Sequence, residues 1–121
     1  MSRVYLTSRQ HFAVFKAECA RCIKLYRIVG WRVEYLHEKL DDVRAECRSD
    51  AANQVVVLVL STHWGDQIPA TDVLVRQTAR HEVIHLIVDK LNEVACFRFV
   101  TKNEHKHAVE ATVRHLEEIL P

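Results

Sequence analysis

Residues 81–85 read HExxH and fall inside the longest helical pattern of the chain. Side chains four residues apart on a helix lie on one face, about one turn from each other. His81 and His85 are therefore placed to bind one metal ion together. Glu82 stands beside them, where it can act as general base toward a water molecule that the metal activates.

The helix that carries this motif is expected from about Val73 to Val94 or Ala95, after capping residues at 70–72. Apolar residues occur almost all the way around it, which is typical of a helix buried in a domain. Burying two imidazoles and a carboxylate is costly unless partners satisfy them. The setting therefore favours a metal site over a chance pattern.

A catalytic zinc ion takes three protein ligands and a water molecule, so a third ligand must join the two histidines. The longer motif HExxHxxGxxH is excluded, because Val88 and Leu91 replace its glycine and last histidine. The final helix is the natural source of this ligand. Glu110 is favoured there, because it lies mid-helix near the edge of the apolar stripe. The other candidates on this helix are Glu104, His105, His107, His115, Glu117 and Glu118.

Two of these candidates have competing explanations. Glu104 stands in the capping-box position of the final helix, three residues after Thr101. Glu117 and Glu118 are expected to be solvated. The register of the third ligand stays open between Glu110 and the alternatives Glu104, His105 and His107.

The remaining elements predict an α+β fold. A first helix is expected from Thr7 or Ser8 to about residue 29, ended by Gly30, and the last helix from Thr101 to Leu120. Alternating apolar and polar residues predict strands at 31–36 and 43–48, and the β-branched run at 54–61 predicts a buried strand. We expect these strands to form a small, mainly antiparallel meander.

Length and composition indicate a single domain over residues 1–121. The chain is 49% hydrophobic and 27% charged, with a formal net charge of +1, the profile of an ordinary soluble protein. This balance gives no argument for nucleic acid or membrane partners. The longest apolar run, residues 55–60, is too short to span a bilayer, and the N-terminus lacks the apolar core of a signal peptide. A cytoplasmic location is therefore expected.

Four cysteines occur, and Cys19 and Cys22 form a CxxC pair. Such a pair invites a redox or zinc interpretation. The pair lies in a helical pattern, however, and no second CxxC or nearby histidine completes a site. Buried or half-buried thiols are the better interpretation, and a disulfide framework is not expected.

The order helix, three strands, HExxH helix, glutamate-bearing helix resembles the small gluzincin-type zinc metallopeptidases, and in particular the compact HExxH proteins of bacteriophages and prophages. The residues that carry the resemblance are 31–35, 55–61 with His63 and Trp64, 79–86, and 110–116. The resemblance implies a minimal zincin-like fold, a peptide or protein substrate, zinc ligands at His81, His85 and Glu110, and Glu82 as the acid/base. One departure is that Val109, not an acidic residue, precedes Glu110.

The implied reaction is hydrolysis of a peptide bond by a water molecule that the metal activates. Glu82 would take the proton and deliver it to the leaving amine. A donor is also needed to stabilise the oxyanion. His107, His115, His63 and Tyr35 are candidates for that donor, and the sequence does not choose among them.

Two alternatives compete with a peptidase. In the first, zinc only adds folding free energy to a small accessory or adaptor protein. In the second there is no metal, and His81 and His85 are core histidines hydrogen-bonded to their neighbours. Neither the substrate nor the oligomeric state can be derived from the sequence.

Overall fold

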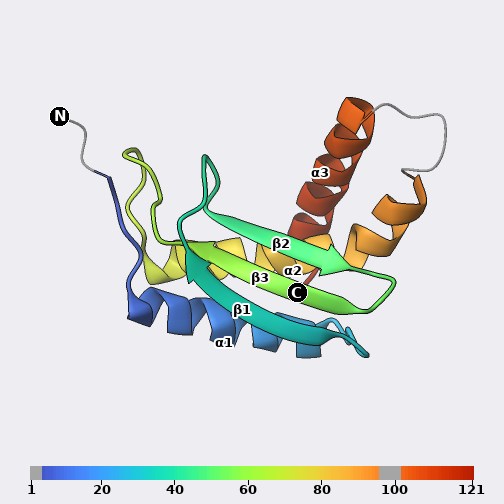
Figure 1. The fold of residues 1–121 in the computed structure, drawn as a ribbon, viewed down its shortest axis with the longest axis horizontal. Helices are drawn as coiled ribbons and strands as arrows, with labels where there is room; N and C mark the ends of the chain where they lie inside the picture. Colours follow the sequence, from blue (N-terminus) through green and yellow to red (C-terminus); the bar gives the residue numbers. More distant parts are fainter. Residues whose placement is uncertain (1–3, 96–101) are drawn as a thin grey trace.

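The computed structural model describes residues 4–95 and 102–121. Its elements follow the order α1 (Arg9–Leu25), β1 (Arg32–Glu38), β2 (Ala45–Asp50), β3 (Val55–Ser61), α2 (Asp72–Ala95) and α3 (Lys102–Ile119). Helices α1 and α2 lie along one face of the sheet, and α3 projects past the edge that β2 forms (Figure 1). The predicted α+β class is confirmed.

The sheet is mixed, with strand order β1-β3-β2. Strand β3 pairs in parallel with β1 and antiparallel with β2, so the expected meander order is wrong, and only one of the two strand pairs is antiparallel. The reason lies in the side chains. Strand β3 is apolar at every position before Ser61 and is suited to the centre, whereas charged residues alternate along β1 and β2. The outer strands can therefore face water.

Helix α1 begins one residue after Ser8, whose side chain accepts a hydrogen bond from the N–H of His11. The helix ends at Leu25, earlier than the expected residue 29. Tyr26 caps this end, and Arg27 then takes a positive φ of 56°. The reversal comes before Gly30, so that glycine lies in the following turn and does not end the helix.

The core lies between the two helices and the inner face of the sheet. Fully buried side chains of α1, β3 and α2 meet there, among them Phe15, Leu58 and Val83. A second, smaller cluster joins α2 to α3 through Ile84, Val88 and Val113. The first cluster fixes the HExxH helix against the sheet, and the second brings α3 alongside it.

Helix α2 is buried over its inner face but not all round. Thr71 accepts a hydrogen bond from the N–H of Leu74 at the start of the helix, as the capping sequence predicts. Val73 and Ile87 are exposed, while the centre of the helix packs in the core. No helix among the described residues is both long enough and apolar enough to cross a membrane.

Candidate metal centre

The HExxH segment lies in the middle of α2, where Val83 packs in the main core with β3 and Ile84 packs against α3. His81 and His85 are half-buried and face the same cleft, while Glu82 turns inward and is only 8% exposed. The two imidazole rings meet edge to face with their centroids 4.9 Å apart. The predicted pairing of the histidines on one helical face is therefore present.

Glu110 of α3 completes a three-residue cluster with these histidines. Its carboxylate oxygens lie 2.9 Å from Nε2 of His85 and 3.7 Å from Nε2 of His81. The two Nε2 atoms are 3.2 Å apart. Taken with one ligand atom from each side chain, the three groups lie within 4.8 Å of one another between α2 and α3.

The ligand atoms around a small divalent cation have a defined spacing. Bonds of about 2.0 Å at tetrahedral angles place neighbouring ligand atoms about 3.3 Å apart. The two Nε2 atoms are 3.2 Å apart and Oε1 of Glu110 lies 2.9 Å from Nε2 of His85, both close to that value, while the 3.7 Å contact with His81 is made by the other oxygen, Oε2. Two imidazole nitrogens and one carboxylate oxygen are also a ligand set that zinc accepts while keeping a fourth position open. The residues present therefore fit a metal ion with this ligand set.

Glu117, one further residue of α3, holds His81 from the other side. Its carboxylate forms a short hydrogen bond with Nδ1 of His81. The expectation that Glu117 is solvated is wrong for this reason. A proton on Nδ1 leaves Nε2 free as a lone-pair donor, which is the tautomer that metal binding needs. Glu117 stands seven residues after Glu110, two helical turns away on the same face, and that spacing was the sequence signal that could have identified it.

Burial shapes the charge of the site. It raises the pKa of Glu82 to about 7, because desolvation disfavours the carboxylate more than nearby His81 stabilises it. Burial likewise lowers the pKa of His85, and Glu110 opposes that shift. In the absence of an ion, Glu82 with a pKa of about 7 is therefore present in both its protonated and its ionised form near neutral pH, while the lowered pKa of His85 favours the neutral imidazole.

The cluster opens onto a cleft with a volume of about 920 Å³. One wall is the face of α2 that runs from Leu74 to His85, and the opposite wall is β2 with the loop before it. Among the residues that the structure describes, β2 pairs only with β3, so its other edge is unpaired within the sheet, and Ala45, Glu46 and Cys47 of this strand line the cleft. Arg44 and Lys106 bring positive charge to the same space.

The other third-ligand candidates lie away from this point. The side chains of Glu104, His107, His115 and Glu118 are exposed on α3, and that of His105 falls outside the described part of the chain. Glu117 contacts the ring nitrogen of His81 that faces away from Glu110. Among the described histidine, cysteine and acidic side chains, His81, His85 and Glu110 form the cluster with metal-ligand spacing.

The candidates for oxyanion stabilisation do not line the cleft. Tyr35 packs against the main core cluster. His63 forms a hydrogen bond with the hydroxyl of Thr62 and pairs with Leu6, close to the N-terminal segment. His107 and His115 are exposed on α3. Arg44 and Lys106, which the sequence did not single out, are the cationic groups that the cleft wall presents.

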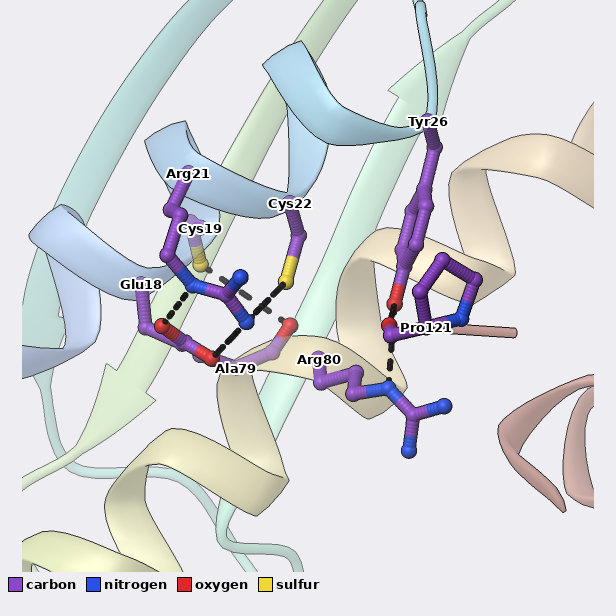
Figure 2. Close-up of polar contacts among 8 residues, drawn as sticks. All are labelled: Glu18, Cys19, Arg21, Cys22, Tyr26, Ala79, Arg80 and Pro121. Carbon is purple, nitrogen blue, oxygen red and sulfur yellow. Dashed lines mark hydrogen bonds and ion pairs between the residues drawn. The ribbon is translucent and has the colours of Figure 1, made fainter. Parts of the chain in front are cut away.

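The CxxC pair belongs to the core. Cys19 and Cys22 are fully buried on the side of α1 that faces α2, and Cys19 lies 3.9 Å from the carbonyl oxygen of Ala79 (Figure 2). Both are free thiols, as is Cys47, and burial raises the pKa of all three. The interpretation as structural thiols is confirmed for these cysteines. Cys96 lies outside the described residues.

Comparison with family models, with curated proteins and with solved structures found no match to this chain.

Proposed function

We propose that the chain is a zinc-dependent peptidase in which His81, His85 and Glu110 hold the metal and Glu82 is the acid/base. The observation that carries this proposal is that one ligand atom of each of these three side chains lies within 4.8 Å of the other two. A carboxylate beside them is shielded from water, and an open cleft leads to them. The three candidate metal ligands, the candidate base and an open cleft that gives access to them therefore occur together.

Zinc, when bound, supplies a Lewis acid that polarises a carbonyl group and lowers the pKa of a water molecule. The residues of the chain do the rest. Glu82 accepts a proton from the attacking water and returns it to the leaving amine. Glu117 keeps the ring of His81 in the required tautomer. The positive side chains of Arg44 and Lys106 are the groups available in the cleft to offset developing negative charge.

The edge of β2 supports a peptide as the substrate. An extended chain can add to an exposed sheet edge through main-chain hydrogen bonds, whatever its sequence. Ala45, Glu46 and Cys47 of β2 border the cleft opposite His81 and Glu82. A peptide paired with this edge would pass alongside the metal cluster, with a peptide bond presented to it.

A second candidate function, a structural role for zinc, has its own observation in favour. Helix α3 packs on α2 through a small apolar cluster, and Glu110 on α3 joins the two histidines on α2. A metal held by these residues would tie the two helices together and add folding free energy. The protein would then be an accessory or adaptor protein without hydrolytic activity.

The test uses protein purified without a histidine tag and loaded with zinc. We expect about one zinc per chain by elemental mass spectrometry, with loss of the metal in a His85→Ala variant. Hydrolysis is measured by mass spectrometry on a mixed peptide library, with Glu82→Gln as the matched control that retains zinc. Cleavage by the wild type and none by Glu82→Gln supports the peptidase. Zinc binding without cleavage of any peptide supports the structural role, and absence of zinc contradicts both.

A further inference from the structure

Arg80 lies at the point where α2 meets the last turn of α3. Its Nη2 atom is 2.5 Å from the carbonyl oxygens of both Glu117 and Leu120. Its Nε atom donates to the hydroxyl oxygen of Tyr26 at 3.0 Å. The Tyr26 hydroxyl in turn donates to the carbonyl oxygen of Pro121 at 2.8 Å. Figure 2 shows Tyr26, Arg80 and Pro121 joined in this way.

These contacts satisfy groups that a helix cannot satisfy by itself. The last carbonyl groups of a helix have no partner within it, and they carry the negative end of the helix dipole. A guanidinium group offers several donors in a fixed plane together with a positive charge. Arg80 therefore fixes both the position and the direction of the final turn of α3.

The same turn carries a residue of the metal centre. Glu117 is held twice, by Arg80 at its main-chain carbonyl oxygen and by His81 at its carboxylate. Arg80 and His81 are adjacent in α2, so two successive residues of that helix form hydrogen bonds with Glu117 of α3. Glu110 lies two turns before Glu117 on the same face. A shift of α3 at its final turn would therefore also move Glu110.

We propose that Arg80 and Tyr26 are positioning residues for the metal centre, which they serve by fixing α3 so that Glu110 and Glu117 meet the histidines. This inference rests on the proposed metal site. Tyr26 connects this contact to α1, because Tyr26 is the residue that caps the C-terminal end of that helix. The three helices are thereby joined at one point, next to the apolar cluster of Ile84, Val88 and Val113.

The first test measures zinc affinity by competition with a chromogenic chelator. Tyr26→Phe keeps the ring and its packing but removes both hydrogen bonds, and we expect zinc to bind about threefold to tenfold more weakly. Arg80→Met should weaken binding by about tenfold or more, and Arg80→Lys should recover part of that loss. Arg114→Met, on an exposed position of α3, is the matched control and should bind zinc as the wild type does.

A second measurement separates positioning from general stability. In a Glu110→Ala/Glu117→Ala background, α3 no longer contributes to the site, so adding Tyr26→Phe should leave the residual zinc affinity unchanged. An effect of Tyr26→Phe of equal size in both backgrounds would overturn the proposal. Melting temperatures of the metal-free proteins give the temperature below which every variant is folded.

The outcome is independent of hydrolysis. If zinc binds and no peptide is cut, the proposed activity fails, while a loss of affinity in Tyr26→Phe still supports the positioning role. If Tyr26→Phe and Arg80→Met both bind zinc as tightly as the wild type, the positioning role fails, even for an active peptidase.

Discussion

The carboxylate of Glu117 bonds to Nδ1 of His81, on the opposite side of the imidazole ring from Glu110. The ring is thus fixed between two glutamates of the same helix. One of them would share the metal, and the other sets the tautomer that makes Nε2 a ligand. Helix α3 therefore contributes two glutamates that contact His81 of the HExxH motif, although the sequence of α3 carries no recognised motif of its own.

Removing this second carboxylate should weaken metal binding without removing a ligand. We expect Glu117→Ala to lower zinc affinity by about 10-fold to 100-fold, because the tautomer and orientation of His81 are no longer fixed. Chelator competition measures the change. Glu118→Ala, the next residue and an exposed one, is the control. Equal affinities for the two variants would show that Glu117 does not act on the site.

The sequence could predict the histidine pair because a four-residue spacing on a helix determines a shared face. It could favour Glu110 but not establish it, since the residue lies off the centre of the apolar stripe. That position now has a physical explanation. Val113 of the stripe packs against α2, so a residue beside the stripe is the one that can reach over the edge of α2 to His81 and His85. Glu117 was a candidate ligand that the sequence analysis expected to be solvated; its hydrogen bond to Nδ1 of His81 was not predicted, although its seven-residue spacing places it on the same helical face as Glu110.

A prediction about pH concerns Glu82 in the metal-free protein. Its pKa is raised from 4.5 to about 7, so between these values the folded carboxyl keeps a proton that the unfolded one loses. The free energy of unfolding should therefore fall as the pH rises from 4.5 to about 7, and level off above that. Each pKa unit is worth about 1.4 kcal/mol, so the total is on the order of 3 kcal/mol.

Urea unfolding of metal-free Glu82→Gln checks this expectation. The variant cannot ionise, so it should exceed the wild type in stability at pH 8 and match it near pH 4.5. His85, whose pKa is lowered by burial, gives the opposite slope below its ordinary value, but it does so in both proteins and cancels in the difference. A difference that does not depend on pH would contradict the buried position of Glu82.

The elements of the fold were easier to predict than their arrangement. Each strand was placed within a few residues by its alternation or by its β-branched run. The strand order β1-β3-β2 was not predicted, because the order depends on which strand is buried on both faces. Val59 provides the example: it points away from the helices yet is fully buried, in the middle of β3 and between Leu36 and Glu46 on its neighbours. An apolar strand that follows a hairpin could equally be an edge strand, and tertiary packing decides.

The reactivity of the cysteine thiols tests how well Cys47, in the wall of the cleft, is shielded from solvent. Cys47 borders the cleft, yet burial raises its pKa, as it does for Cys19 and Cys22 in the core. Because the thiolate is the reactive form, we expect iodoacetamide at pH 8 to alkylate these three cysteines much more slowly than a free thiol. Peptide mapping by mass spectrometry assigns the sites, and protein unfolded in urea is the control. Rapid labelling of Cys47 in the folded protein would contradict the packing of β2 on α2.

The last prediction concerns the contact that holds α3 on α2. Val113 is 0% exposed and packs against Ile84 and Val88. Val113→Ala removes two buried methyl groups and should lower the free energy of unfolding of the metal-free protein by about 2 kcal/mol. Val73→Ala makes the same change at a residue that is 58% exposed on α2, so it should leave stability unchanged or slightly raise it.

The two variants should also differ in metal binding, because Glu110 and Glu117 lie on either side of Val113 along α3. A loosened α3 would present both carboxylates less often, so Val113→Ala should bind zinc more weakly than Val73→Ala when both are fully folded. Saturating zinc should then restore part of the lost stability, since a ligand that binds only the folded state shifts the equilibrium toward it. If Val113→Ala lost stability and kept full zinc affinity, the apolar contact would support the fold and not the site, and the hold on Glu110 would have to come from Arg80 and Tyr26 alone.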